Sequence, residues 1–132
     1  MFDMPLRITR GARTFCDRHW RWHQRPGHST GFNLWFVVGG QGTLRTAHAT
    51  YKLHLGDCFL LRMWDVNIGE HDPDNPLVVP WVCFDCLDGH GRPLPPSKCP
   101  RPPEHRRISD WTFFDELLQR VLDRQAEDER HP

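Results

Sequence analysis

The sequence lacks features suited to a membrane or to a phosphate backbone. No apolar run approaches the length that crosses a bilayer, and residues 1–5 lack the basic-then-apolar layout of a signal peptide. An excess of one charge is also missing, because 17 Lys and Arg residues balance 17 Asp and Glu residues. No overall basic field therefore attracts nucleic acid. We expect a cytoplasmic protein that does not enter a membrane and does not bind nucleic acid through this chain alone.

Familiar enzyme signatures are absent as well. The sequence has no Gly-x-Ser-x-Gly nucleophile motif, no glycine-rich phosphate loop before a helix and no internal repeat. Its 5 cysteines are an odd number, which does not favour a framework of paired disulfides. With 132 residues, 38% of them hydrophobic, the chain suffices for one domain with a single core.

The sequence does contain a series of strand-length apolar runs separated by turn residues. They occupy residues 32–38, 43–46, 50–55, 58–62 and 77–85. Runs of this length, without a helical pattern between them, are typical of an antiparallel sandwich or barrel. Residues 32–38 are largely apolar on both faces, which predicts a central strand. Glycines at 39, 40 and 42 predict that a hairpin turn follows it.

Two N-terminal segments are predicted to join this structure. Residues 5–15 are typical of an edge strand broken at Gly11, and the nearby arginines fit either an anion-facing patch or charges that protect an edge. In residues 19–25, strand alternation places Trp20 and Trp22 on one face and Arg21, His23 and Arg25 on the other. An aromatic face and a cationic face fit a binding cavity and an ordinary half-buried strand equally well.

The character of the chain changes after residue 87. Residues 88–108 are proline-rich and are predicted to form a connecting arm. Residues 109–125 predict an amphipathic helix, because apolar side chains recur at spacings of three and four: Trp111, Phe114, Leu118, Val121 and Leu122. We expect residues 1–87 to form the barrel, with this helix packed on it or on a second copy of the chain.

The order of four short motifs resembles a known family. Gly-Gln-Gly at 40–42 is followed by Tyr-x-Leu-x-Leu-Gly-Asp at 51–57, His-Asp-Pro-Asp-Asn-Pro at 71–76 and Trp-Val-x-Phe-Asp at 81–85. This order resembles the N-terminal cupin domain of AraC-type bacterial transcription regulators. The resemblance implies an all-β double-stranded β-helix, also called a cupin or jelly-roll barrel, with a C-terminal helix. It also implies that the chain senses a small molecule, often a sugar, and that the helix-turn-helix DNA-binding half is missing from it.

The same resemblance implies where a ligand binds. Trp81 matches a tryptophan that stacks on a sugar ring inside the barrel, and Arg25 matches an arginine that faces ligand hydroxyls. An indole covers the apolar face of a sugar, and a guanidinium offers several fixed donors. Core packing for Trp81 and a surface charge for Arg25 remain open alternatives. We complete the expected ligand-binding set with four further residues: Trp20, Trp35, Asn67 and His71.

Metal catalysis is the competing interpretation, because many cupins hold a metal through three histidines and a glutamate. Here the corresponding positions give His28, Trp35 in place of the acid, Asn67, and His71 displaced into a loop. At most two ligands remain, and an open catalytic site needs about three. Cys83, Cys86, His90 and Cys99 superficially resemble a zinc cluster, but Cys83 and Cys86 would point to opposite faces of one strand.

The sequence therefore predicts a sugar- or sugar-acid-sensing domain without a cofactor and without catalytic activity. We expect it to form a homodimer. A stand-alone metal-dependent cupin enzyme is the alternative, and a structural dimerisation domain without a ligand is a third possibility.

Overall fold

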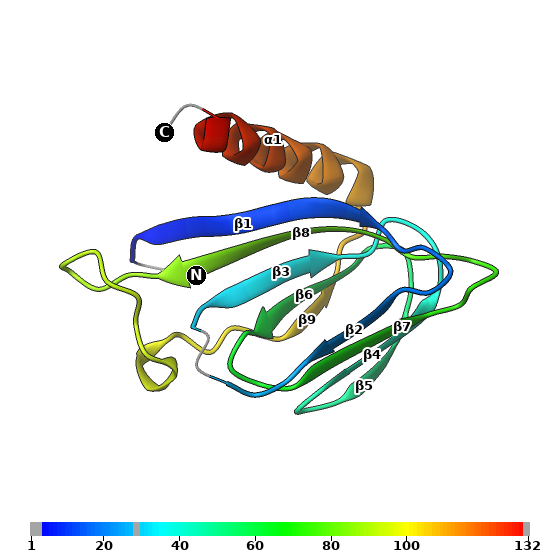
Figure 1. Cartoon of the computed structure of the whole chain (residues 1–132), viewed down its shortest axis with the longest axis horizontal. Coiled ribbons are helices and arrows are strands. Elements are labelled where there is room, and N and C mark those ends of the chain that lie inside the picture. The colour runs from blue at the N-terminus through cyan, green and yellow to red at the C-terminus, as the bar shows by residue number, and fades with distance from the viewer. Residues whose placement is uncertain (1–3, 28–29, 131–132) are drawn as a thin grey trace.

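The computed structural model describes residues 4–27 and 30–130, which form two packed antiparallel sheets and one long helix (Figure 1). One sheet has five strands in the order β1-β8-β3-β6-β9, and the other has four in the order β2-β7-β4-β5. The strands are β1 (Leu6–Phe15), β2 (Arg21–Gln24), β3 (Phe32–Phe36), β4 (Gly42–Thr46), β5 (Thr50–Leu53), β6 (Asp57–Arg62), β7 (Asn67–His71), β8 (Val78–Cys86) and β9 (His105–Arg107). A 3₁₀ turn, η1, covers Pro96–Lys98, and the helix α1 covers Trp111–Arg130. This architecture confirms the predicted all-β fold with a C-terminal helix.

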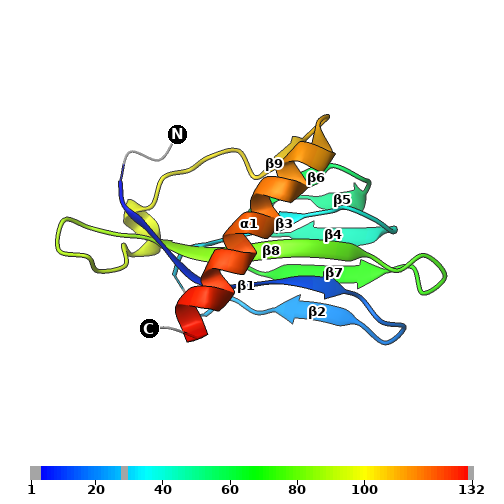
Figure 2. The same ribbon diagram turned by 90° about the horizontal axis from the view of Figure 1, so that it is seen from above.

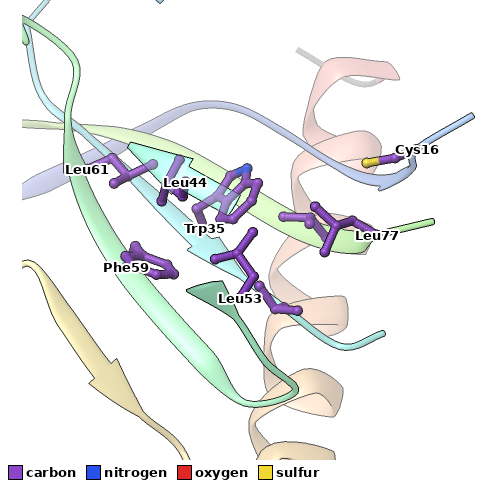
Figure 3. Packing of buried hydrophobic residues seen from close by; sticks show 9 residues of the cluster. Cys16, Trp35, Leu44, Leu53, Phe59, Leu61 and Leu77 are labelled. Carbon is purple, nitrogen blue, oxygen red and sulfur yellow. The ribbon is translucent and has the colours of Figure 1, made fainter. Parts of the chain in front are cut away.

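The main core lies between the two sheets (Figure 3). Trp35, Phe59 and Leu61 enter it from the five-stranded sheet, while Leu44 and Leu53 enter it from the four-stranded sheet. Strand β3 pairs with both β6 and β8 and is buried on both faces, as predicted for a central strand. Both of its faces are apolar because the core covers one face and α1 covers the other.

Helix α1 lies across the outer face of the five-stranded sheet, above β1 and β8 (Figure 2). Its buried side chains, Leu118 and Leu122, pack with Phe36 and Val82 in a second apolar cluster. Beside this cluster, Arg13 of β1 donates to Asp115 at 2.7 Å and to Gln119 at 2.9 Å. No helix in the described part of the chain is long and apolar enough to cross a membrane.

The predicted hairpin turn at residues 39–42 is wrong. Strand β3 pairs with β6 and β8, whereas β4 pairs with β5 and β7 in the other sheet, so this segment crosses between sheets. Its glycines permit a close approach to the start of β8 and the residues before it: Gly39 bridges Val78, and a Cβ on Gly40 would clash with the Pro76 carbonyl. Gly40 also has a positive φ of 81°, which glycine adopts without strain.

Other element boundaries also differ from the prediction. Strand β1 is continuous through Gly11, and its irregularity lies between Ile8 and Arg10. Residues 67–71 form β7, which places His71 at the end of a strand rather than inside a loop. The helix begins at Trp111 and continues to Arg130, five positions beyond the predicted end at 125.

The proline-rich segment 88–108 is not an arm throughout, because its last residues form β9 against β6. Asp57, only 2% exposed, accepts bonds there from His105 Nε2 at 2.9 Å and Arg107 Nε at 3.3 Å. Glu104 accepts a bond from the Tyr51 hydroxyl at 2.8 Å. The chain is therefore anchored to both sheets immediately before α1 begins.

Candidate ligand-binding cavity

A cavity of about 260 Å³ lies between the two sheets on the side where both have an edge. Strand β1 ends one sheet and β2 ends the other, and the two edges lie on the same side of the molecule (Figure 2). Residues 16–20 connect them. The cavity is lined by Arg10, Thr14, Cys16, Trp20, Trp22, Gln24, Asn33, Met63, Val79 and Trp81.

Three indoles form most of the aromatic wall of this cavity. Trp20 and Trp22 lie over Gly69 of β7, where an added Cβ would be 2.9 Å from Trp20 Cη2. Glycine at this position therefore makes room for the indoles. On the opposite sheet, Trp81 Nε1 donates to Thr14 Oγ1 at 2.9 Å, which fixes the plane of its ring.

The polar groups of the cavity are few. Gln24 Nε2 donates to the Met63 carbonyl at 2.8 Å and connects β2 to the end of β6. Asn33 is 5% exposed, and its Oδ1 is buried without a hydrogen-bond partner in the described part of the chain. The Arg10 guanidinium lies 6.0 Å from the Trp81 ring centroid. Burial raises the pKa of the neighbouring Cys83 thiol, and Arg10 opposes this rise.

The size and lining of the cavity suit a small organic ligand. Sites for drug-sized ligands typically occupy about 300–1,000 Å³ and combine apolar walls with a few convergent polar groups. A cavity of about 260 Å³ is just below this range and fits a molecule of one ring.

Comparison with protein families supports the same interpretation. Residues 11–130 match the family described as the AraC-like ligand binding domain. The chain belongs to this family. A search of curated proteins found no match. Membership in the AraC-like family confirms the predicted cupin-type fold and assigns the chain to the small-molecule-binding domains of regulators.

The AraC-like fold places only two of the predicted ligand-binding residues on the cavity wall. Trp81 and Trp20 line the cavity. Trp35 is 3% exposed and lies beneath it, stacked on Trp22 with ring centroids 6.0 Å apart. Arg25 follows β2 and is exposed, on the side of the strand away from the core.

The remaining two predicted residues, Asn67 and His71, lie at opposite ends of β7. Asn67 Nδ2 donates to the Arg62 carbonyl at 3.1 Å, which ties together the turn between β6 and β7. The His71 ring contacts the edge of Trp20 with centroids 5.7 Å apart. Both of its nitrogens are buried without a partner among the described residues. His71 therefore supports the back of an indole that lines the cavity.

The residues described here do not fit the metal set of a catalytic cupin. Within residues 4–27 and 30–130, no group of three or more His, Cys, Asp and Glu side chains could hold a metal ion. His28 lies outside the described residues. Cys86 packs with Cys99 in an apolar cluster, whereas Cys83 lies beside Arg10. The two thiols of the Cys-x-x-Cys sequence therefore have separate surroundings.

Sequence reasoning missed several cavity residues. Strand alternation puts Asn33 on the same face as Trp35, so the sequence does contain a signal that Asn33 points toward the core. Arg10 lies in the arginine-rich first strand, but the sequence does not show that β1 pairs with β8 beside Trp81. Gly69 carries no side chain, so its role is visible only from the two indoles that cover it.

Proposed function

We propose that this chain is the effector-sensing module of an AraC-type transcription regulator and acts in the cytoplasm. Its ligand is a sugar-like molecule of one ring, bound in the cavity against Trp81 and Trp20. The observation that carries the proposal is the cavity itself, in which three indoles and a few polar groups meet at the open edge of the sandwich. The apolar face of a sugar ring packs on an indole, while its hydroxyls need polar partners.

The cavity and the helix share the same two strands. Along β8, Trp81 faces the cavity and the next residue, Val82, packs against Leu118 and Leu122 of α1. Along β1, Thr14 faces the cavity and Arg13 binds Asp115. A ligand that repositions Trp81 therefore changes the surface on which α1 packs. Binding would shift the population between two positions of the helix.

A sensor of this type acts through a DNA-binding half and through a second copy of the chain. The described residues contain one α-helix, so a helix-turn-helix DNA-binding half would be supplied by residues outside this chain. We propose homodimerisation through α1, on which Phe113 is 57% exposed and Leu117 is 43% exposed. Apolar side chains that do not pack on the sheet are available to a second copy.

A thermal-shift screen against monosaccharides and sugar acids tests the sensing function, after elemental analysis of the same sample. A sensor binds one compound without converting it, and binding raises the melting temperature. Trp81→Ala abolishes this shift. Trp64→Ala is the matched control, because Trp64 contacts Phe32 in another cluster and does not line the cavity. Stoichiometric zinc, iron or manganese, with turnover lost on chelation, would instead support the enzyme alternative.

A further inference from the structure

Asn33 Oδ1 is the most unusual polar atom of the cavity. The side chain lies in the central strand β3, it is 5% exposed, and its oxygen accepts no hydrogen bond from the described residues. Buried acceptors in native proteins are nearly always paired, and an unpaired one is costly. Because Asn33 lines the cavity, a bound ligand can supply the missing donor. A ligand hydroxyl is such a donor.

The charge of the cavity is set by Arg10. Among the described lining residues Arg10 alone carries a formal charge, and it has no ion pair within the described chain. The nearby carboxylate of Asp85 is already engaged, since it accepts a bond from Thr30 at 3.0 Å and lies 4.0 Å from Arg7. Arg10 bonds the Cys83 thiol and lies over an indole but has no carboxylate partner among the described residues, which favours an anionic group at the cavity mouth.

Strand register fixes how far apart the backbones of Asn33 and Arg10 lie. Asn33 pairs with Cys83, and Cys83 pairs with Arg10, so the three residues form one row across β3, β8 and β1. Neighbouring strands lie about 4.8 Å apart, which separates the Asn33 and Arg10 backbones by roughly 10 Å. An amide oxygen at one end of this row and a guanidinium at the other can bind two substituents of the same six-membered ring.

We propose that the cavity selects a hexuronate, a sugar acid of one ring. One ring hydroxyl donates to Asn33 Oδ1, the carboxylate accepts from Arg10, and the ring lies against Trp81. This inference rests on the proposed sensing function and names the class of ligand. Arg10 distinguishes a sugar acid from the parent sugar, and Asn33 binds a hydroxyl that both compounds have.

Isothermal titration calorimetry with two matched pairs tests the role of Arg10. The probes are glucuronate with glucose and galacturonate with galactose, since each pair differs only at C6, which is a carboxylate in the acid and a hydroxymethyl group in the sugar. At least one uronate is expected to bind tenfold or more tightly than its hexose. Arg10→Gln reduces the affinity for that uronate to within about threefold of the hexose, because the charge-assisted bond is lost. Arg7→Gln, on the same strand but beside Asp85, leaves both affinities unchanged.

Asn33→Leu tests the other end of the site and has two readouts. The leucine cannot accept a hydrogen bond, so affinity for the bound uronate falls tenfold or more. The urea midpoint of unfolding stays the same or rises, because an unpaired buried oxygen is removed. A variant that unfolds at lower urea and still binds normally would assign Asn33 a structural role and overturn its part of the proposal.

The outcomes separate the inference from the function on which it rests. If a hexose binds as tightly as its uronate and Trp81→Ala weakens both, the sensing function stands and the preference for an acid is refuted. If neither class binds and no compound in the thermal screen shifts the melting temperature, the sensing function fails as well.

Discussion

Replacing Leu122 with alanine tests whether α1 is packed on the sheet as described. Leu122 is 8% exposed and shares a cluster with Phe36, Val82 and Leu118. Its Cδ2 also lies 2.8 Å from the position of a Cβ added to Gly11, so it fills the space above β1. Truncation of a buried leucine costs about 2–5 kcal/mol. We expect about 2–3 kcal/mol, because Leu122 packs in the outer cluster beneath a helix and not between the sheets.

Leu117→Ala is the matched control, since Leu117 lies on the same helix but is 43% exposed. Both substitutions change helix propensity equally, so the difference between them reports packing alone. We expect Leu117→Ala to cost less than about 1 kcal/mol. Urea unfolding of each variant measures the two free energies, with unchanged m values, at protein concentrations low enough to dissociate a dimer formed through α1. Equal losses for the two variants would refute the docking of α1 and, with it, the proposed route from the cavity to the helix.

Three further properties can be measured directly. Burial and the bond to Glu104 raise the pKa of Tyr51, the only tyrosine, to about 12. The phenolate absorbance of Tyr51 should therefore appear near pH 12 in the folded protein. The stability that the raised pKa contributes is complete below about pH 10 and is lost as pH rises to 12. A titration midpoint near pH 10 in the folded protein would contradict this. Burial likewise raises the pKa of Cys16 and Cys86 to about 11 and of Cys58 to about 12. Because all 5 cysteines are buried, their thiols should react with a thiol reagent only after unfolding. Rapid modification of a thiol in the native protein would contradict this burial. Gly69→Ala should displace Trp20, weaken ligand binding and shift the tryptophan emission, whereas Gly89→Ala, which has open space around it, should do neither.

The sequence predicted best what depends on local alternation. The two apolar faces of residues 32–38 and the opposite faces of Trp81 and Val82 follow from the period of a strand, and the structure has both. The apolar spacing of Leu118 and Leu122 predicted the face of α1 that packs on the sheet. In each case the neighbouring residues alone determine which face is buried.

What the sequence could not provide is the pairing of distant strands. Glycines at 39–42 fit a hairpin locally, and only the tertiary structure sends β3 and β4 to different sheets. Residues 105–107, His-Arg-Arg, are polar and carry no strand pattern; β9 forms because Asp57 and the edge of β6 bind it. Arg25 is close in sequence to Trp22 yet exposed, whereas Arg10 reaches Trp81 because β1 pairs with β8.

The same pairing supports the proposed route from the cavity to the helix. Side chains in a strand alternate between faces, so any strand that lines a cavity inside a sandwich also presents side chains to its outer face. In β1 and β8 these outer positions are occupied by Arg13, Gly11 and Val82, all of which contact α1. Gly11 leaves no room for adjustment there, because an added Cβ would be 2.9 Å from the Trp81 carbonyl and closer still to Leu122. Under the proposed sensing function, such a tightly packed layer would transmit a displacement of Trp81 to the helix instead of absorbing it.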